Sequence, residues 1–370
     1  MANPSEQVDA ARVLLREVCA LFAVHGDEAV LQPLLAQSPK LKSRVMLRHA
    51  PERVTMEDKP SQIVRRGQNT SMWRAIECVK KGEADVAVSA GNTGALMAMS
   101  LLQLRTIEGI SRPAIASIWP TMKGRTVVLD VGANVTATAE QLVDFAVMGE
   151  AFAHAILNLE RPIVGLLNVG SEEMKGNDAV KGAAQILRTS KLPIAFHGFV
   201  EGNDITEGLV DVVVTDGFTG NIALKTAEGA AKLVAQYLRQ ALKRSLLGMI
   251  GAFFAQGALN TLRRNLDPRA SAGGIFLGLN GVVVKAHGGT DAIGCRGVST
   301  QPDRAGEPGL GFARQFQRAL CSWPRQPGEG AQRTPLRHPL DRPGTAHARL
   351  RAGVAGDLEM LGNPGEAGIR

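Results

Sequence analysis

The sequence predicts an α/β protein in which a mostly parallel β-sheet is covered by helices on both faces. Short runs of Val, Ile and Leu alternate with longer helical segments between about Gly26 and Gly294. These runs are continuously apolar, which is typical of strands buried on both faces. At 370 residues, 45% of them hydrophobic, the chain is long and apolar enough to bury a large core.

The β-branched runs place the expected strands. They lie at Val45–Arg48, Asp85–Val88, Ala114–Ile118, Thr126–Leu129, Ile163–Val169, Ile194–Phe199, Asp211–Val214 and Val282–Lys285. Helical periodicity predicts helices at Met72–Lys81, Gly94–Arg105, Ala139–Leu159, Ala179–Thr189 and Asn221–Ser245. Ligands of such folds gather beyond the carboxyl ends of the strands, so the loops that follow the strands are the candidate site.

Two of these loops share the pattern Gly-x-Thr-Gly between a valine-rich strand and a helix. One copy lies in VAVSAGNTGALMAMSLL, Val86–Leu102, and the other in VVVTDGFTGNIALKTAEG, Val212–Gly229. A helix that starts at such a turn leaves its first N–H groups unpaired at the positive end of the helix dipole, which favours an anion such as phosphate. The same pattern also fits an ordinary strand-to-helix turn capped by Thr or Asn.

Two further strand ends carry polar loops. VVLDVGAN places Asp130 and Asn134 after one strand, and NVGSEEMKGNDAVK places Lys175, Asn177 and Lys181 after another. If these strands are parallel neighbours, all four loops meet at one edge of the sheet. Such a cluster of lysines, amides and helix N-termini suits an anion and offers no obvious covalent nucleophile.

The sequence lacks the motifs of a P-loop, a dinucleotide-binding turn and a nucleophile elbow. The sequence contains no G-x-x-x-x-G-K-[ST], no G-x-G-x-x-G after a strand and no G-x-S-x-G. His287 is a candidate general acid or base, although a single histidine near a strand end is more often structural. Glu172 and Glu173 are interpreted as a solvated pair of loop residues.

The amino-acid composition limits which cellular compartment and which binding partners we expect for this protein. The formal net charge is +7, but the last 76 residues hold 11 Arg and 7 acidic residues, which leaves +3 for residues 1–294. This nearly neutral body argues against a nucleic-acid-binding surface. Four scattered cysteines without a C-x-x-C pair suggest neither a disulfide framework nor a metal site, and no cofactor is expected. The N-terminus lacks a signal-peptide pattern, so we expect a cytoplasmic protein.

Leu238–Pro268 differs from the rest of the chain. Its apolar centre carries Phe253 and Phe254 and is too short to span a bilayer. The flanking cations are Arg239, Lys243, Arg244, Arg263 and Arg264. This composition suits a helix lying in an anionic membrane surface, and it suits a core or dimer-interface helix equally well.

At this point the sequence resembles a known family, the phosphate acyltransferases of bacterial phospholipid synthesis. The resemblance rests on SAGNTGAL, EGI-x-RPA, VVLDVGAN, FAVMG, NVGSEEMKGN, VVVTDGFTGNIALKT and VVKAHGG, in the family's order between about Gly26 and Gly294. It implies a Rossmann-like three-layer α/β/α sandwich similar to the isopropylmalate dehydrogenase group. It also implies a homodimer and a protruding helical hairpin, residues 238–268, that faces the membrane.

The resemblance further implies a reaction. A fatty acyl group moves from acyl carrier protein to inorganic phosphate, and a glycerol-3-phosphate acyltransferase uses the acyl phosphate downstream. We expect Lys175 and Lys181 to act as cations for phosphate or oxyanion, with Asn221 and Asp216 orienting the attack. The expected phosphate- and substrate-binding residues are Ser89, Asn92, Thr93, Asp130, Asn134, Asn177, Gly217, Thr219, Gly220 and His287. The hairpin's basic residues would face the anionic membrane surface or the acidic carrier protein.

Both ends of the chain depart from the family pattern. Residues 1–25 stand where family members have a first strand and a glycine-rich turn, so we expect that strand and loop to be missing. Residues 295–370 contain no Lys and are rich in Arg, Pro and Gly, as in translation from another reading frame, and we expect a disordered tail. These departures leave two alternatives open: an enzyme resembling phosphate acetyltransferases that uses coenzyme A thioesters, and an inactive membrane-associated relative.

Overall fold

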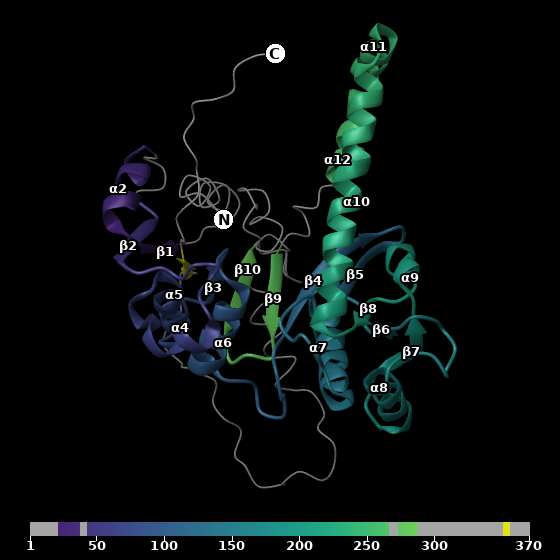
Figure 1. Cartoon of the computed structure of the whole chain (residues 1–370), viewed down its shortest axis with the longest axis horizontal. Helices are drawn as coiled ribbons and strands as arrows, with labels where there is room; N and C mark the ends of the chain where they lie inside the picture. Colours follow the sequence, from purple (N-terminus) through teal and green to yellow (C-terminus); the bar gives the residue numbers. More distant parts are fainter. Residues whose placement is uncertain (1–20, 38–42, 266–272, 287–350, 356–370) are drawn as a thin grey trace. The chain divides into compact units, whose positions relative to one another are not determined.

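The computed structural model describes residues 21–37, 43–265, 273–286 and 351–355 (Figure 1). The chain divides into two compact units, so residues 26–294, expected as one domain, contribute to both. The first unit contains the described residues up to Arg105 together with 281–286 and 351–355, and the second contains those between Thr106 and Asn280.

The first unit is built on a parallel sheet. Its strands are β1 (Leu21–Gly26), β2 (Val45–His49), β3 (Val86–Ser89), β10 (Val282–Ala286) and β11 (Arg351–Ala355), in the spatial order β2-β1-β11-β3-β10. The helices are α2 (Glu28–Ala36), α4 (Pro60–Arg66), α5 (Ser71–Lys80) and α6 (Thr93–Leu104), with a 3-10 turn at Gly67–Asn69. Thr70 and Asn92 start α5 and α6 by accepting hydrogen bonds from N–H groups of the first helical turn.

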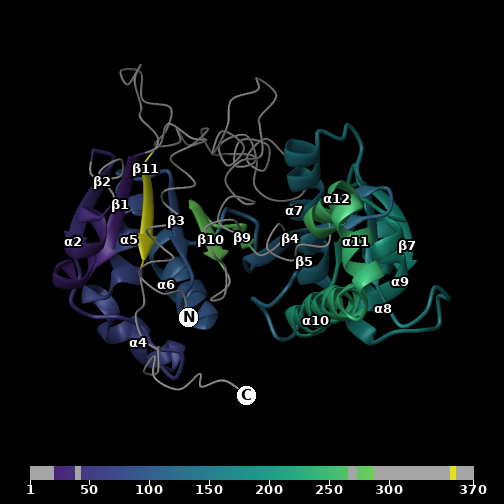
Figure 2. The same cartoon turned by 90° about the horizontal axis from the view of Figure 1, so that it is seen from above.

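Two strands of this sheet differ from the sequence expectation. β1 precedes the first strand expected from sequence, and β11 lies in the segment expected to be disordered. β11 pairs in parallel with β1 and with β3, so the ladder runs without interruption from β2 to β10 (Figure 2). The expected gap and disorder therefore do not hold for these residues. Main-chain hydrogen bonds do not depend on composition, so five residues between two parallel neighbours can complete a sheet.

The second unit has a mixed sheet with the spatial order β9-β4-β5-β8-β6-β7. Its strands are β4 (Ala114–Thr121), β5 (Gly124–Leu129), β6 (Ile163–Leu167), β7 (Ala195–Val200), β8 (Val212–Val214) and β9 (Gly273–Leu277). β4 runs antiparallel to both of its neighbours, and the remaining pairs are parallel. Val127, Val128 and Leu129 of β5, and Val212 and Val213 of β8, are fully buried and form the centre of the core.

Helices surround this sheet, as the sequence predicts. They are α7 (Ala139–Leu157), α8 (Asp178–Thr189), α9 (Gly202–Glu207) and the start of α10 (Gly217–Lys243). Two further helices of this unit, α11 (Leu246–Phe254) and α12 (Gln256–Asn265), lie away from the sheet. Thr138 and Gln141 form a capping box at the start of α7. Gly149 lets α7 approach the sheet closely, because a Cβ there would lie 2.6 Å from Val212 and 2.8 Å from Leu129.

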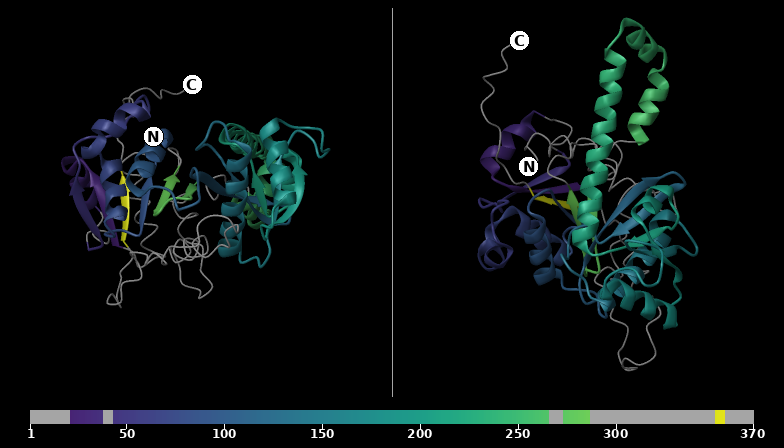
Figure 3. Two further views of the ribbon diagram at one scale, coloured as in Figure 1. Left: turned by 90° about the horizontal axis from the view of Figure 1, so that it is seen from below. Right: turned by 45° about the vertical axis from the view of Figure 1, so that its right-hand side comes forward.

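α10 is the longest helix of the described chain, and only its first turns dock on the sheet. It has 27 residues, about 40 Å at 1.5 Å per residue. Its buried residues are Gly217, Gly220 and Leu224, all near the start. The rest projects from the second unit, with α11 at the tip and α12 running back (Figure 3). The expected helical hairpin is therefore present, with a stem that begins well before Leu238.

Candidate functional site

Three of the four predicted loops meet at one edge of the second sheet. β8 lies between β5 and β6 and runs parallel to both, with Val214 level with Leu129 on one side and with Leu166 on the other. The loops that follow these three strands, together with the first turns of α8 and α10, carry all the second-unit residues predicted for the active site. The fourth loop, with Ser89, Asn92 and Thr93, belongs to the first unit.

Asp130 organises the loop that follows β5. Its side chain is completely buried and accepts hydrogen bonds from the main-chain N–H groups of Ile115 (3.0 Å), Gly132 (3.1 Å), Ala133 (2.9 Å) and Asn134 (2.7 Å). The amide of Asn134 adds a fifth at 2.9 Å. Burial raises the pKa of Asp130, and these hydrogen bonds oppose the rise. We therefore assign Asp130 to shaping the loop and not to contacting phosphate.

Asn134 joins this loop to the start of α10. Its side chain is buried and donates to the carbonyl of Pro113 at 2.8 Å, while its own carbonyl accepts the N–H of Gly217 at 2.7 Å. Asp216 accepts the N–H of Thr219 with its carboxylate at 2.7 Å and that of Gly220 with its carbonyl at 2.9 Å. Three N–H groups at the start of α10 are thus already satisfied.

This capping occupies the N–H groups of Gly217 and Thr219, two of those that the sequence predicts to be open to an anion. The carboxylate of Asp216 lies at the positive end of the helix dipole, where it stabilises the helix. Positive charge for a bound phosphate must then come mainly from side chains.

Asn221 lies against the Asp130 loop. A Cβ at Gly132 would lie 3.6 Å from the side chain of Asn221, and Gly132 has a φ of +134°, a conformation that favours glycine. Asn221 itself is exposed. The structure therefore brings Asn221, Asp130, Asn134 and the start of α10 together.

Lys175 and Lys181 follow β6. Lys175 is exposed and Lys181 is half-buried. Lys175 forms an ion pair of 2.8 Å with Glu172, and this hydrogen bond raises the pKa of Lys175. Lys181 lies 3.4 Å from Asp178. Asn177 caps α8 by accepting the N–H of Val180 at 2.9 Å. Both lysines lie at the sheet edge where β5, β8 and β6 end, and each is paired with a carboxylate close to it in sequence.

Glu172 and Glu173 are exposed, as the sequence predicts for a solvated loop pair. Glu173 pairs with Arg188 at 3.0 Å.

In the first unit, the candidate residues stabilise their own loop. The hydroxyl of buried Ser89 accepts the N–H of Gly91 at 3.2 Å. The side chain of Asn92 accepts the N–H of Ala95 and donates to three carbonyls in the segment Thr55–Asp58. Thr93 is the first residue of α6. These contacts give Asn92 a structural role.

Sequence reasoning missed Lys285, which lies beside the first Gly-x-Thr-Gly loop. Its side chain is 9% exposed, and its Nζ donates to the carbonyl of Ala90 at 3.4 Å and to that of Ala286. The signal was a lysine inside an apolar strand, VVVKA, since buried lysines are rare. His287, the predicted acid or base, lies outside the described residues.

Arg112 was also missed, because it precedes a strand. Its guanidinium donates to the side-chain oxygen of Asn134 at 3.5 Å. The sequence reading treated the strands as parallel and examined only the loops that follow them. β4 is antiparallel to β5, so its beginning lies level with the end of β5.

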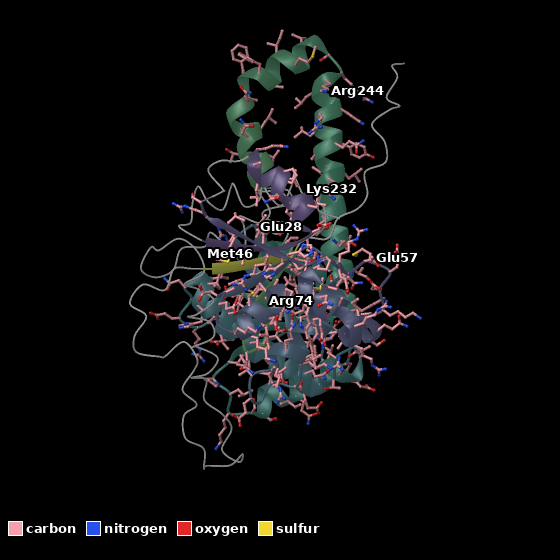
Figure 4. The ribbon with its side chains drawn as sticks, turned by 90° about the vertical axis from the view of Figure 1, so that its left-hand side faces the viewer. Glu28, Met46, Glu57, Arg74, Lys232 and Arg244 are labelled. Atoms are coloured by element: carbon pink, nitrogen blue, oxygen red, sulfur yellow. The ribbon has the colours of Figure 1, made fainter. Side chains whose placement is uncertain are left out.

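The hairpin exposes apolar side chains at its tip. Leu247, Phe253 and Phe254 are 81%, 71% and 81% exposed, and Met249 and Ile250 are about half exposed. The two phenylalanine rings pack edge to face at 5.6 Å. Arg239, Lys243 and Arg244 are exposed at the C-terminal end of α10. Figure 4 shows Arg244 near the tip of the hairpin. The side chains of Arg263 and Arg264 lie outside the described part of the structure.

The described residues contain neither a metal-binding cluster nor a membrane-spanning helix. No cluster of three or more His, Cys, Asp or Glu is arranged to hold a metal ion. None of the described helices combines the length and apolarity needed to cross a membrane.

A family model and the sequences of named relatives identify one family. A family model described as "Fatty acid synthesis protein" matches residues 3–303. The phosphate acyltransferase of Parvibaculum lavamentivorans is 59% identical over 274 residues, 74% of this chain and 76% of the relative. That of Sinorhizobium fredii is 56% identical over 287 residues, covering 77% and 83%. A phosphotransacetylase structure from Streptococcus pyogenes is 20% identical, covers 79% of this chain and 88% of its own, and has a TM-score of 0.49.

The α/β fold, the polar loops at one sheet edge and these relatives define the chain as an acyltransferase. More particularly, the chain belongs to the phosphate acyltransferase family of fatty acid and phospholipid synthesis. The sequence-based assignment to this family is confirmed.

Proposed function

We propose that this protein transfers a fatty acyl group from acyl carrier protein to inorganic phosphate, releasing acyl phosphate and free carrier protein. The observation that carries the proposal is the meeting of the loops after β5, β8 and β6 at one sheet edge, in a chain whose relatives are named phosphate acyltransferases. These loops offer cations and amides for phosphate and contain no residue that must act as a covalent nucleophile.

The chemistry needs positioning more than it needs a reactive side chain. A phosphate oxygen attacks the thioester carbonyl carbon, a C–O bond forms, and the C–S bond breaks as the thiolate leaves and takes up a proton. Alignment of two reactants can lower the barrier by about 7 to 11 kcal/mol. We assign Lys175 and Lys181 to phosphate or to the developing oxyanion, and Asn221, held beside the capped start of α10, to alignment of the attack. Loss of one such donor typically costs about a hundred- to a thousand-fold in rate.

Exposed apolar side chains in the same loops support a fatty acyl substrate. Val135, Val169, Met174 and Phe218 are 72%, 79%, 88% and 60% exposed, and each stands in or directly after one of the three loops. Apolar side chains beside a phosphate site are what an acyl thioester with a long chain requires.

The hairpin suggests where the reaction takes place. Its exposed apolar tip and the nearby cations suit insertion into an anionic membrane surface from the cytoplasm, with the basic stem attracting the acidic carrier protein. A membrane-bound location would deliver the acyl phosphate to a glycerol-3-phosphate acyltransferase. We further propose a homodimer.

The deciding experiment measures thiol release from a long-chain acyl carrier protein by the 370-residue chain, with and without phosphate. Phosphate-dependent release together with acyl phosphate would support the proposal. Release only from a coenzyme A thioester would favour the acetyltransferase-like alternative. If the folded protein releases thiol from neither donor, the remaining interpretation is an inactive membrane-associated relative of the family.

A further inference from the structure

The antiparallel strand β4 brings an additional loop to the proposed phosphate site. Ala116 of β4 pairs with Leu129 at the end of β5, and Ala114 pairs with Leu277 at the end of β9. The segment that precedes β4 therefore lies at the edge where β5, β8 and β6 end. Arg112 is in this segment, two residues before the strand.

Successive contacts fix this segment to the loop after β5. The N–H of Ile115 donates to Asp130 at 3.0 Å, and the carbonyl of Pro113 accepts from the side chain of Asn134 at 2.8 Å. The guanidinium of Arg112 then reaches the other end of the same Asn134 amide at 3.5 Å. Because Asn134 also accepts the N–H of Gly217, Arg112 is held one residue away from the start of α10.

The charges around Arg112 leave it available for an anion. Asp216 already caps α10, and Lys175 and Lys181 each have a carboxylate partner. Within residues 21–37, 43–265, 273–286 and 351–355, Arg112 forms no ion pair with a carboxylate, and its side chain is exposed. This single contact with a neutral amide oxygen is long, whereas a guanidinium and a phosphate can form two short hydrogen bonds between opposite charges, so the first is readily exchanged for the second.

We propose that Arg112 binds the phosphate substrate directly, as a planar cation that donates two hydrogen bonds to its oxygens. The inference rests on the proposed function, because it identifies a residue of that same site. Arginine suits this task because its fixed fork matches two phosphate oxygens, whereas lysine offers a point charge. Asn134 acts as a positioning residue that holds the guanidinium toward the phosphate.

The test compares Arg112→Ala and Arg112→Lys with Arg161→Ala. Arg161 is also exposed in the second unit, but it precedes β6, which is parallel to β8, so it lies at the opposite sheet edge. The dissociation constant of inorganic phosphate is measured by calorimetry, and KM for phosphate and for acyl carrier protein by thiol release. We expect Arg112→Ala to weaken phosphate binding at least about tenfold without changing KM for the carrier, Arg112→Lys to recover part of the loss, and Arg161→Ala to match wild type.

Calorimetry separates failure of the inference from failure of the proposed function. Wild-type phosphate affinity in Arg112→Ala would overturn the role of Arg112, whatever the enzyme's activity. A lower melting temperature with unchanged phosphate affinity would show that Arg112 only stabilises the position of Asn134. That result would also overturn the inference. Wild-type protein that does not bind phosphate would overturn both proposals. If Arg112→Ala weakens phosphate binding but the wild-type protein transfers no acyl group, the inference holds and the proposed function is wrong.

Discussion

Gly220, in the first turn of α10, packs directly against the main-chain carbonyl of Asp130. A Cβ at this position would lie 2.0 Å from that oxygen, far inside van der Waals contact. The distance between α10 and the end of β5 is therefore set by the absence of a side chain at one residue. Asn221 follows immediately, so this contact also positions the residue assigned to aligning the attack.

Gly220→Ala should consequently destabilise the second unit and reduce activity. Forcing a methyl group into a packed contact typically costs about 1 to 3 kcal/mol, and any relief must come from moving α10 away from the loop. Gly229→Ala in the same helix is the control. A Cβ there meets no atom within 4 Å, so this variant should be more stable by about 0.5 to 1 kcal/mol. Urea unfolding of both variants checks the pair, and equal effects would contradict the packing argument.

Asp130→Asn should weaken the loop although the shape of the side chain is nearly unchanged. The carboxylate accepts five hydrogen bonds, and an amide in its place would turn one acceptor into a donor facing N–H groups. We expect a loss of about 1 to 3 kcal/mol in the free energy of unfolding. We also expect a fall in kcat, measured by thiol release. Unchanged stability would show that the network is not needed to hold the loop.

Lys175→Ala should lower kcat/KM for acyl transfer by about a hundredfold, the loss expected for one group that stabilises developing negative charge. Lys191→Ala is a matched control. Lys191 is also an exposed lysine, but it precedes β7 and so lies at the opposite end of the parallel strands. Because Lys175 is exposed and its ion pair with Glu172 is at the surface, its removal should barely change thermal stability. Wild-type kinetics in Lys175→Ala would remove the residue from the mechanism.

The double variant Phe253→Ser, Phe254→Ser should lose binding to vesicles of anionic lipid while keeping its melting temperature. Both rings are already exposed, so the substitutions remove apolar surface from the tip and little from the core. Met122→Ser, at the equally exposed turn between β4 and β5, should bind vesicles like wild type. Sedimentation with vesicles measures the difference. Retained binding in the double variant would point to another membrane-facing surface or to none.

Glu150 in α7 should make stability depend on pH. It is 6% exposed, its Oε2 has no hydrogen-bond partner among the residues that the structure describes, and burial raises its pKa from 4.5 to about 7. A carboxyl with a raised folded-state pKa contributes stability that is complete below about pH 4.5 and is lost as the pH rises through 7.

Glu150→Gln carries no ionisable group at this position, so its stability should exceed that of wild type by a margin that grows as the pH rises. The gain in unfolding free energy should approach about 1 to 3 kcal/mol at pH 8 and be about four times smaller at pH 5. Urea unfolding of both proteins at the two pH values measures it. An identical difference at pH 5 and pH 8 would show that Glu150 does not titrate in this range.

The local elements followed closely from sequence. Val127–Leu129 and Val212–Val214 are continuous β-branched or aliphatic runs, and they became buried parallel strands, because that composition fits a sheet covered on both faces. The helix start at Asn92 was equally readable from its capping residue. The sequence did not predict β1 or β11. LFAVHG is short, and RAGVA lies in a segment whose composition argues against folding.

By itself, then, the sequence determined the fold class, the family and the loops that form the candidate site, because burial patterns and turn residues act over short distances along the chain. Only the tertiary structure decided which groups remain available in those loops. The burial of Asp130 and the arrival of Arg112 just before an antiparallel strand both depend on residues distant in sequence. Strand direction and hydrogen-bond partners are set when elements pack against one another, and no local pattern encodes them.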